Sequence, residues 1–386
     1  MTFRVHEITK VTILSLLPLL AIVAFFVLGE TSIRIYYFTV EGVSVAQWHR
    51  FLVGHFGNST LDENLGWKAT EGYHVVRMEK TSQGVPYTLD LTQDEKGFRM
   101  YGRPTSSKTK VFVVGDSFTH AREVSDRKTY YALVAKNLDI EMFAYGVENF
   151  GTLQEYMVFD RFVDEIKPDL VIWQYCFNDF VNNDPALEGR TRLHTDFRQR
   201  PYWVDGKIVH AMPGSAWGAV RKLAYRYSRF VVFLLSRIDR LYGKYFLDSV
   251  ESEIEQQADQ HPGFKRAAST TSEIMGRVRA RAGARPIVAF TCKAVEPYNT
   301  ALKEISHEHG ILFVEEVALA VDEAARRGED VFHADGAHWS ETGHRVAGEV
   351  LARHLRSLLA RDQRMNRVPG SFWDNSPEER RVALYD

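Results

Sequence analysis

Short apolar runs that alternate with longer amphipathic stretches constrain the fold of this chain more than any other feature. Each run is rich in β-branched and aromatic residues, as in Val111-Phe112-Val113-Val114. Continuous apolar strands separated by helices are typical of a parallel sheet that is covered on both faces. The pattern predicts strands over residues 110–115, 140–145, 169–176, 286–291 and 311–315. It predicts helices over residues 127–138, 153–166, 294–309, 316–327 and 341–360.

Composition excludes several classes of function. The 386 residues are ample for one large domain with appendages, and 45% of them are hydrophobic, as in a globular protein. The formal net charge of −2 gives no reason to expect nucleic-acid binding. The chain shows no P-loop, no dinucleotide fingerprint and no zinc-ligand spacing. We therefore expect neither a metal nor a cofactor.

The amino-terminal segment predicts a membrane anchor. Residues 11–29 carry no charge, and a helix of about 20 apolar residues crosses a bilayer. Arg4 and Lys10 precede this span and Glu30 follows it, which favours residues 1–10 as a cytoplasmic stub and the rest outside the cytoplasm. A cleaved signal peptide is the alternative. The span is longer than a usual signal core and no small-x-small site follows it, so we favour an uncleaved anchor.

A serine follows the first predicted strand of the alternating region. Gly115-Asp116-Ser117 comes directly after the apolar run, and a predicted helix lies further along. Open α/β sheets bind their ligands at the carboxyl ends of strands, so Ser117 stands where a nucleophile would be expected. The tripeptide is a weak signal by itself, because a small residue, an acid and a serine also form an ordinary turn or helix cap. A base nearby would make it a strong one.

Such a base is present near the carboxyl end of the chain. Asp335 precedes His338 by three residues, in a turn that contains Gly336, and the helix of residues 341–360 follows. A serine hydroxyl needs a base within hydrogen-bond reach, and the base needs a carboxylate to hold its tautomer. One loop can thus deliver both groups. An Asx turn with a surface histidine is the alternative, and Ser117 at a strand end makes it the weaker one.

Two further strand ends carry candidate oxyanion donors. The strand of residues 169–176 runs into Asn178-Asp179, and an asparagine amide can donate to a developing oxyanion. A turn asparagine that caps the next segment is the alternative. After the strand of residues 140–145, Gly146 and Gly151 flank a loop whose backbone N–H groups could approach a ligand.

Together these residues resemble the SGNH (GDSL-like) hydrolases over about residues 110–360. Ser117 matches the nucleophile of the first family block, and Asn178 matches the asparagine of the third. Asp335 and His338 match the Asp-x-x-His pair of the fifth block, and the glycine of the second block falls at Asn149. The resemblance implies a flavodoxin-like strand order in a three-layer α/β/α sandwich with a parallel sheet. It also implies a bacterial host.

The chain departs from the family pattern at two positions. Asn149 replaces a glycine, but its N–H remains and asparagine tolerates positive φ, so the oxyanion hole can stand. Gly146 and Gly151 stay open as alternative matches in that loop. Cys176 stands where the third block usually has glycine, which narrows the space beside Asn178.

The flanking regions divide the chain further. Residues 30–105 predict a juxtamembrane region of short strands, and residues 106–360 predict the hydrolase domain with a helical insertion at 180–285. Residues 361–386 predict a polar tail.

Within the insertion, residues 220–246 have apolar and aromatic residues at helical spacing. They also carry many basic side chains: Arg221, Lys222, Arg226, Arg229, Arg237, Arg240 and Lys244. We favour a helix packed on the domain with a solvated basic face. A helix on the membrane surface, or a lid over the site, is the alternative.

The chain has two cysteines, and both end predicted strands. Cys176 and Cys292 could therefore be neighbours in the sheet, and a disulfide could form outside the cytoplasm. We expect two free buried thiols instead, because the geometry at strand ends rarely suits a bridge.

The resulting interpretation is a membrane-anchored serine esterase whose domain lies in the bacterial periplasm. The resemblance implies that Ser117, His338 and Asp335 form the catalytic triad, and that the Ser117 N–H, the Asn149 N–H and the Asn178 side chain form the oxyanion hole. The expected substrate is a small, acetyl-like ester on a cell-envelope or exported glycan. An O-acyltransferase with the same triad, served by a membrane-bound acyl-donor protein, is the first alternative. A non-catalytic glycan-binding scaffold is the second.

Overall fold

The computed structural model describes residues 2–40, 55–191, 199–212, 218–246 and 249–365. Its centre is a six-stranded sheet with the order β13-β12-β9-β7-β8-β6. The strands are β6 (Met100–Tyr101), β7 (Lys110–Gly115), β8 (Glu141–Gly146), β9 (Leu170–Tyr175), β12 (Ile287–Thr291) and β13 (Leu312–Phe313). All pairs are parallel except β6, which runs antiparallel to β8 at one edge.

The strand order is the one that the resemblance implies. With β7, β8, β9, β12 and β13 taken as the first to fifth parallel strands, their order is 2-1-3-4-5. The order reverses between β7 and β9, where Val113 pairs with Ile172. The predicted strand boundaries agree with the observed ones to within one residue for the four inner strands. The last strand is shorter than predicted, because β13 lies at the edge and pairs with β12 at only Leu312 and Phe313.

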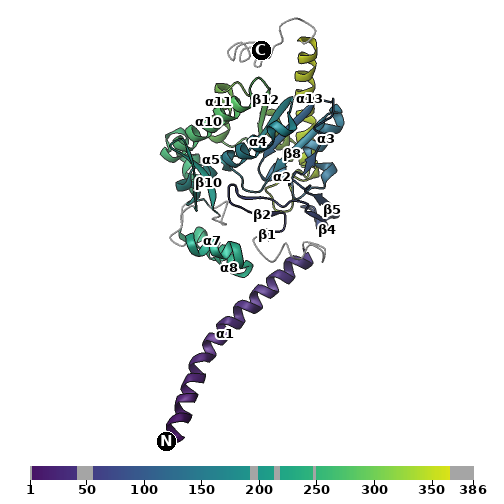
Figure 1. The fold of residues 1–386 in the computed structure, drawn as a ribbon. Helices are drawn as coiled ribbons and strands as arrows, with labels where there is room; N and C mark the ends of the chain where they lie inside the picture. The colour runs from purple at the N-terminus through teal and green to yellow at the C-terminus, as the bar shows by residue number, and fades with distance from the viewer. Residues whose placement is uncertain (1, 41–54, 192–198, 213–217, 247–248, 366–386) are drawn as a thin grey trace.

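Helices cover both faces of the sheet (Figure 1). One face packs against α4 (Thr152–Ile166), α10 (Pro262–Ala282) and α11 (Tyr298–Glu308), in the core that contains Phe112. The other face packs against α3 (Tyr130–Leu138), α12 (Glu316–Arg326) and α13 (Glu341–Met365), in the core that contains Val111 and Val113. Alternate residues of one strand thus enter opposite cores, which confirms the three-layer sandwich.

Local sequence explains where these helices begin and end. At the start of α3, the Thr129 side chain accepts a hydrogen bond from the backbone N–H of Ala132. At its end, Asp139 takes the left-handed conformation, and its N–H donates to the carbonyl of Ala135. The predicted start at residue 127 was early, because Asp126–Lys128 forms a separate 3₁₀ turn.

Residues 55–101 supply small sheets beside the sandwich. They form β1 (His55–Phe56), β2 (Ser59–Asp62), β3 (Gly66–Ala69), β4 (His74–Lys80) and β5 (Pro86–Thr92), followed by β6 in the main sheet. Trp67 and Phe98 are buried in the same core as Phe112. The region therefore contributes to the core of the domain as well as leading to it.

The segment between β9 and β12 contains more than helices. Its described elements are α5 (Asn178–Asn182), α6 (Pro185–Glu188), β10 (Arg200–Val204), β11 (Lys207–Ala211), α7 (Gly218–Tyr227), α8 (Arg229–Phe246), α9 (Val250–Gln257), a 3₁₀ turn (Ala258–Gln260) and α10. The strands β10 and β11 form an antiparallel hairpin that the sequence did not predict. The helix expected over residues 220–246 is two helices, with Ser228 between them.

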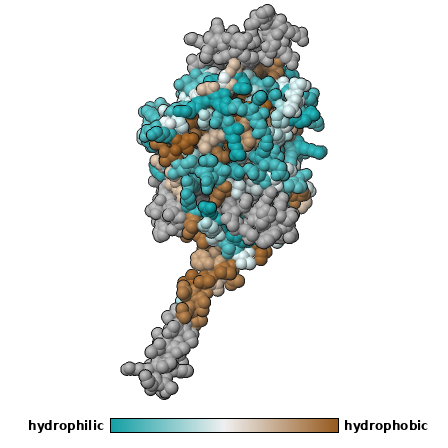
Figure 2. Space-filling view, viewed as in Figure 1, coloured by the Kyte–Doolittle hydropathy of each residue, from teal (hydrophilic) through white to brown (hydrophobic). Residues whose placement is uncertain are grey.

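The amino-terminal helix α1 (Thr2–Val40) extends from the domain (Figure 1). It is continuous through Pro18 and longer than the predicted span of residues 11–29. Leu16–Tyr36 is long and apolar enough to cross a membrane, with a mean hydropathy of 2.1, and it is not buried by the rest of the protein. Figure 2 shows the hydrophobic surface along this helix. At the other end, α13 continues to Met365, and the predicted tail beyond it lies outside the described residues.

The expectation of two free thiols was wrong. Cys176 and Cys292 form a disulfide, with a Cα–Cα distance of 5.3 Å. The parallel register explains the pairing, because Tyr175 and Thr291 are partners at the ends of β9 and β12. The next residue on each strand is a cysteine, so the two side chains meet just beyond the ladder, where the strand ends are close enough for a bridge.

Candidate active site

The turn between β7 and α2 (Ser117–His120) holds Ser117 at the carboxyl end of the central strand. Asp116 caps α2, because its side chain accepts a hydrogen bond from the backbone N–H of Phe118 at 3.0 Å. At the other end, Ala121 takes the left-handed conformation and donates its N–H to the carbonyl of Ser117 at 2.8 Å. The turn is therefore fixed at both ends by hydrogen bonds within the segment.

A buried glutamine on the neighbouring strand supports the same turn. The Gln174 side-chain oxygen accepts hydrogen bonds from the backbone N–H groups of Asp116, at 3.2 Å, and Thr119, at 3.1 Å, and from the Thr119 hydroxyl at 2.8 Å. A Cβ at Gly115 would lie 2.4 Å from that oxygen. Only glycine at this strand end leaves room for the amide that holds the turn.

The structure brings the three residues of the predicted triad together. The Ser117 Oγ lies 3.0 Å from the His338 Nε2, and the His338 Nδ1 lies 2.6 Å from the Asp335 Oδ2. The other Asp335 carboxylate oxygen accepts the backbone N–H groups of Ala337, at 2.9 Å, and His338, at 3.1 Å. These bonds hold the carboxylate in line with the imidazole, in the arrangement of nucleophile, base and orienting acid.

The hydrogen bonds within this group shift the pKa values of both Asp335 and His338. Burial by itself raises the pKa of Asp335, but the hydrogen bonds from the His338 side chain and the two backbone N–H groups outweigh it and hold that pKa well below its usual value. Burial by itself lowers the pKa of His338. The Asp335 hydrogen bond and the charges of Glu123, Asp335 and Glu148 outweigh burial and raise it to about 9.

Glu123 is a second carboxylate beside the base. Its Oε1 lies 3.7 Å from the His338 Nδ1 and 2.9 Å from the Arg122 Nε, and its side chain is buried. The Glu123 carbonyl accepts a hydrogen bond from the Tyr87 hydroxyl of the β4–β5 hairpin at 2.7 Å. Glu123 is too far from the imidazole for a hydrogen bond, so it acts on His338 through its charge.

The predicted oxyanion donors lie at the two neighbouring strand ends. Asn149 has a φ of 60° and its carbonyl accepts a hydrogen bond from Arg200 of β10 at 2.9 Å. Gly146 is within the β7–β8 ladder, and the Gly151 N–H donates to the Gln154 side chain at 3.2 Å. Asn178 begins α5 at the end of β9, is buried, and its side chain forms a hydrogen bond with Asp116.

Two buried histidines near the site are structural. His120 forms a hydrogen bond with Gln93 at 2.9 Å, and burial lowers its pKa to about 3. His344, on α13, accepts the backbone N–H of Tyr130 at 3.3 Å, and burial lowers its pKa to about 3. Both rings are therefore neutral, and His338 is the histidine that reaches Ser117.

Other side chains hold the loops around the site. The guanidinium of Arg99 is buried and donates to the carbonyls of His120, Ala121 and Val124. It thereby connects the segment directly before β6 to the loop that follows Ser117. An isolated antiparallel β-bridge, a backbone pairing between Thr81 and His333, joins the β4–β5 hairpin to the loop that carries His338.

Three of these groups could also act as metal ligands. Glu123, Asp335 and His338 place one ligand atom each within 4.8 Å of one another. In this arrangement the His338 Nδ1 and the Asp335 Oδ2 already form the 2.6 Å hydrogen bond, which an ion would have to replace. The geometry fits proton transfer between Ser117 and the imidazole directly.

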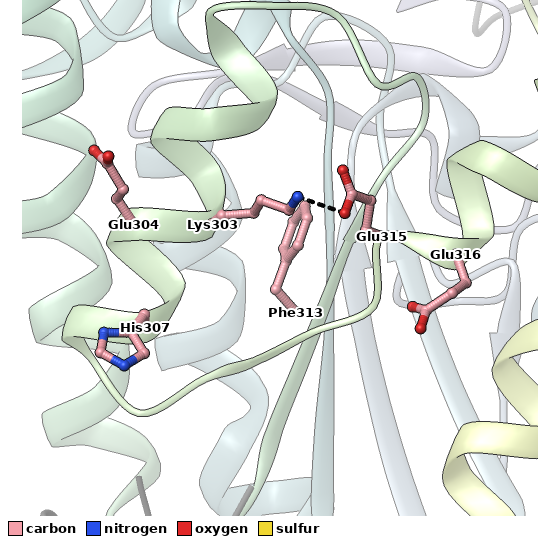
Figure 3. A pocket seen from close by; sticks show the side chains of 6 residues that line it. All are labelled: Lys303, Glu304, His307, Phe313, Glu315 and Glu316. Carbon is pink, nitrogen blue, oxygen red and sulfur yellow. Dashed lines mark ion pairs between the residues drawn. The ribbon is translucent and has the colours of Figure 1, made fainter. Parts of the chain in front are cut away.

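A separate pocket lies away from the triad, between α11, β13 and α12 (Figure 3). It is lined by Lys303, Glu304, His307, Phe313, Glu315 and Glu316, and Lys303 and Glu315 form an ion pair across it. It is at the edge of the sheet, whereas Ser117 is at the central strand.

Sequence reasoning did not identify Glu123, Gln174 or Arg99 as part of the site. Gln174 offered a signal, since it is a polar residue inside a strand that is otherwise apolar and aromatic. Glu123 and Arg99 offered none, because their role depends on which atoms they approach after folding.

Comparison with known proteins finds similar solved structures only. No family model matches the chain, and no curated protein matches it. A lipolytic G-D-S-L family member from Veillonella parvula is 11% identical over 64% of this chain and 97% of its own, with a TM-score of 0.36. An acetylxylan esterase from Geobacillus stearothermophilus is 13% identical over 64% of this chain and 94% of its own, with a TM-score of 0.34. The protein TesA is 12% identical over 65% of this chain and 99% of its own, with a TM-score of 0.37.

The strand order of this chain defines its fold class without reference to the identities and TM-scores of these structures. A 2-1-3-4-5 parallel sheet carries a serine after the first strand, an asparagine after the third and an Asp-x-x-His loop before the last helix. This is a three-layer α/β/α sandwich whose parallel sheet has the flavodoxin-like strand order.

Proposed function

We propose that this protein is an extracytoplasmic serine esterase that cleaves a small acyl ester, such as acetyl, from a cell-envelope or exported glycan. The observation that supports the chemistry is the relay from the Ser117 Oγ through the His338 imidazole to the Asp335 carboxylate, with distances of 3.0 and 2.6 Å. The glycan and the small acyl group are what the resemblance to membrane-anchored members of the SGNH (GDSL-like) family implies.

In the proposed reaction, neutral His338 takes the Ser117 proton at Nε2 while the Ser117 Oγ bonds to the ester carbonyl carbon. The N–H groups of Ser117 and Asn149 and the Asn178 amide stabilise the resulting oxyanion. His338 returns the proton to the alcohol oxygen as the ester C–O bond breaks, which leaves an acyl-enzyme. Water then attacks this intermediate by the same proton transfers and releases the carboxylic acid.

The test uses the full chain, purified in detergent. A fluorophosphonate should label Ser117, as identified on the labelled peptide, and Ser117→Ala should lose both the label and hydrolysis of 4-nitrophenyl acetate by a factor of at least about 10³. Ser357→Ala, at an exposed position on α13, is the matched control and should retain both. Hydrolysis that survives in Ser117→Ala would refute the mechanism.

Acyl transfer is distinguished in the same assay. Addition of a deacetylated polysaccharide should leave the release of 4-nitrophenol and acetate equal if the protein is an esterase. Acetyl groups found on the polysaccharide, in place of free acetate, would assign the triad to an O-acyltransferase. Absence of both label and turnover in the wild type would favour the non-catalytic scaffold.

A further inference from the structure

The junction between α7 and α8 forms hydrogen bonds with α1. The Glu30 carboxylate of α1 accepts hydrogen bonds from the Ser228 hydroxyl, at 2.8 Å, and from the backbone N–H groups of Arg229, at 3.1 Å, and Phe230, at 2.9 Å. These N–H groups belong to the first turn of α8, which has no partners for them within the helix. A carboxylate at this end also complements the helix dipole.

Apolar contacts reinforce the same junction. The Phe230 ring packs against the rings of Phe25 and Phe26, with centroid distances of 5.3 and 5.9 Å. A Cβ at Gly29 would lie 2.5 Å from the Phe230 ring, so glycine is required for this close approach. The junction is therefore built from adjoining residues of α1, namely an aromatic pair, a glycine and a carboxylate.

The position of Glu30 sets the depth of α8 in a bilayer. About 20 helical residues cross the hydrocarbon layer, and the charge-free stretch of residues 11–29 has this length and leaves Glu30 at its boundary. The window Leu16–Tyr36 would instead place Glu30 and Arg34 inside the hydrocarbon, so we take residues 11–29 as the span. The ion pair between Glu30 and Arg34 also belongs at the level of the headgroups, where charged groups remain hydrated. The beginning of α8 is bound to Glu30, so α8 begins at the same level.

Both helices expose apolar side chains next to basic ones. Leu223 of α7 is 62% exposed, and Ile238 and Leu241 of α8, three residues apart on one helix face, are 59% and 57% exposed. Lys222, Arg226 and Arg237 are also exposed. Exposed leucine and isoleucine beside lysine and arginine are typical of helices that lie in the membrane interface.

We propose that α7 and α8 form a platform on the surface of the membrane that α1 spans. Leu223, Ile238 and Leu241 enter the boundary between headgroups and acyl chains. Lys222, Arg226 and Arg237 contact the phosphate groups of anionic phospholipids. The lipid surface is chosen over a protein partner because the platform is continuous with the exposed apolar span of α1 through Phe230. This replaces our expectation of a helix packed on the domain.

The platform also orients the catalytic edge of the sheet. The loop that carries His338 leads directly into α13, and α13 runs away from α1 to the opposite end of the molecule (Figure 1). The carboxyl ends of the strands therefore lie on the α1 side. An ester presented near the membrane surface could reach Ser117 there, a consequence that rests on the proposed function, whereas the lipid contact does not.

Lipid contact is measured on the full chain in nanodiscs. Single cysteines introduced as Leu223→Cys, Ile238→Cys and Leu241→Cys carry an environment-sensitive fluorophore, and lipids with a doxyl group near the headgroup act as quenchers. Leu28→Cys, exposed at the end of the apolar span beside Glu30, is the positive control. Ser357→Cys, exposed on α13, is the negative control. Cooperative thermal unfolding shows that each labelled protein is folded.

We expect quenching at Ile238 and Leu241 at least threefold stronger than at Ser357, and stronger in phosphatidylglycerol discs than in phosphatidylcholine discs. The triple variant Lys222→Gln, Arg226→Gln, Arg237→Gln should lose this dependence on lipid charge. Quenching at Ile238 no stronger than at Ser357 would overturn the proposal, as would a lipid-charge dependence that the triple variant retains. Energy transfer between labels on two chains in one disc, without lipid quenching, would assign the surface to a second copy and also overturn it.

Discussion

Under the proposed mechanism, removal of the Glu123 charge should make ester hydrolysis faster at neutral pH, which is an unusual effect for a residue beside the proposed base. Glu123 lies 3.7 Å from the His338 Nδ1 and stabilises the protonated imidazole, whereas Asp335 at 2.6 Å orients it. The substitution Glu123→Gln keeps the size of the side chain and removes only its charge. The imidazole should then lose its proton at lower pH.

The size of the change in the His338 pKa follows from the distance between Glu123 and the imidazole and from the charge of Arg122. An opposite charge within about 4–6 Å shifts a pKa by about 1–3 units. Arg122, 2.9 Å from Glu123, offsets part of this effect, so we expect a change of about one unit. Starting from a His338 pKa of about 9, the neutral fraction at pH 7 rises from about 1% to about 9%. A neutral imidazole of lower pKa is also a weaker base and takes the Ser117 proton more slowly. The net gain in kcat/KM should therefore be about threefold.

The assay is the pH dependence of kcat/KM for 4-nitrophenyl acetate, with the full chain in detergent. In the wild type kcat/KM should rise with pH up to a midpoint near the His338 pKa of about 9. In Glu123→Gln the midpoint should fall by about one unit, with a lower plateau at high pH. Glu123→Asp retains the charge and should keep a midpoint close to that of the wild type. An unchanged midpoint in Glu123→Gln, or a wild-type midpoint near 7, would refute this reasoning.

The same variant changes stability in a pH-dependent way. The pKa of His338 is raised from 6.5 to about 9, so its protonation stabilises the folded state. This contribution, about 3 kcal/mol, is fully present below pH 6.5 and is lost as the pH rises through about 9. Glu123→Gln should therefore cost about 1 kcal/mol more unfolding free energy at pH 6 than at pH 10, as measured by urea denaturation. An equal cost at both values would contradict the linkage.

The remaining predictions concern the orientation of the His338 imidazole, the support of the Ser117 turn by Gln174, and the disulfide. Asp335→Asn should lower kcat by about 10³–10⁴ without loss of fold, since the imidazole loses the group that holds its tautomer; normal kcat would exclude Asp335 as the orienting acid. Gln174→Leu should cost about 2–4 kcal/mol of unfolding free energy, because two buried backbone N–H groups lose their acceptor; a cost under about 1 kcal/mol would show that the turn does not need the amide. Replacement of Cys176 and Cys292 by serine should cost about 2–5 kcal/mol by thermal denaturation, since the bridge closes a loop with a sequence separation of 116; unchanged stability would show that the bridge is not formed.

Much of the architecture is encoded locally. The strand Lys110–Gly115 was predicted with its observed boundaries, because a run of apolar β-branched residues ends at a glycine. The predicted helix of residues 316–327 differs from Glu316–Arg326 by one residue. Local signals failed for the β10–β11 hairpin, whose strand Lys207–Ala211 is mostly exposed and so lacks an apolar pattern.

The candidate site divides in the same way. Ser117, Asn178, Asp335 and His338 could be selected from the sequence, because each follows a recognisable strand or stands in a motif with fixed spacing. Glu123 could not be selected, since its effect on the imidazole is a distance across 215 positions of the chain that no local pattern records. The disulfide was judged wrongly for the related reason that its formation depends on the register between β9 and β12.

By itself, the sequence determined the alternation of strands and helices, the apolar amino-terminal span and the residue types at the strand ends, since these depend on neighbours a few positions apart. Only the tertiary structure decided that the Glu123 carboxylate lies 3.7 Å from the His338 Nδ1. It likewise decided that Gln174 supports the turn of Ser117 and that Glu30 binds the first turn of α8. Electrostatic and hydrogen-bond energies depend on distances of a few ångströms between atoms, and folding alone sets those distances for residues far apart in the chain.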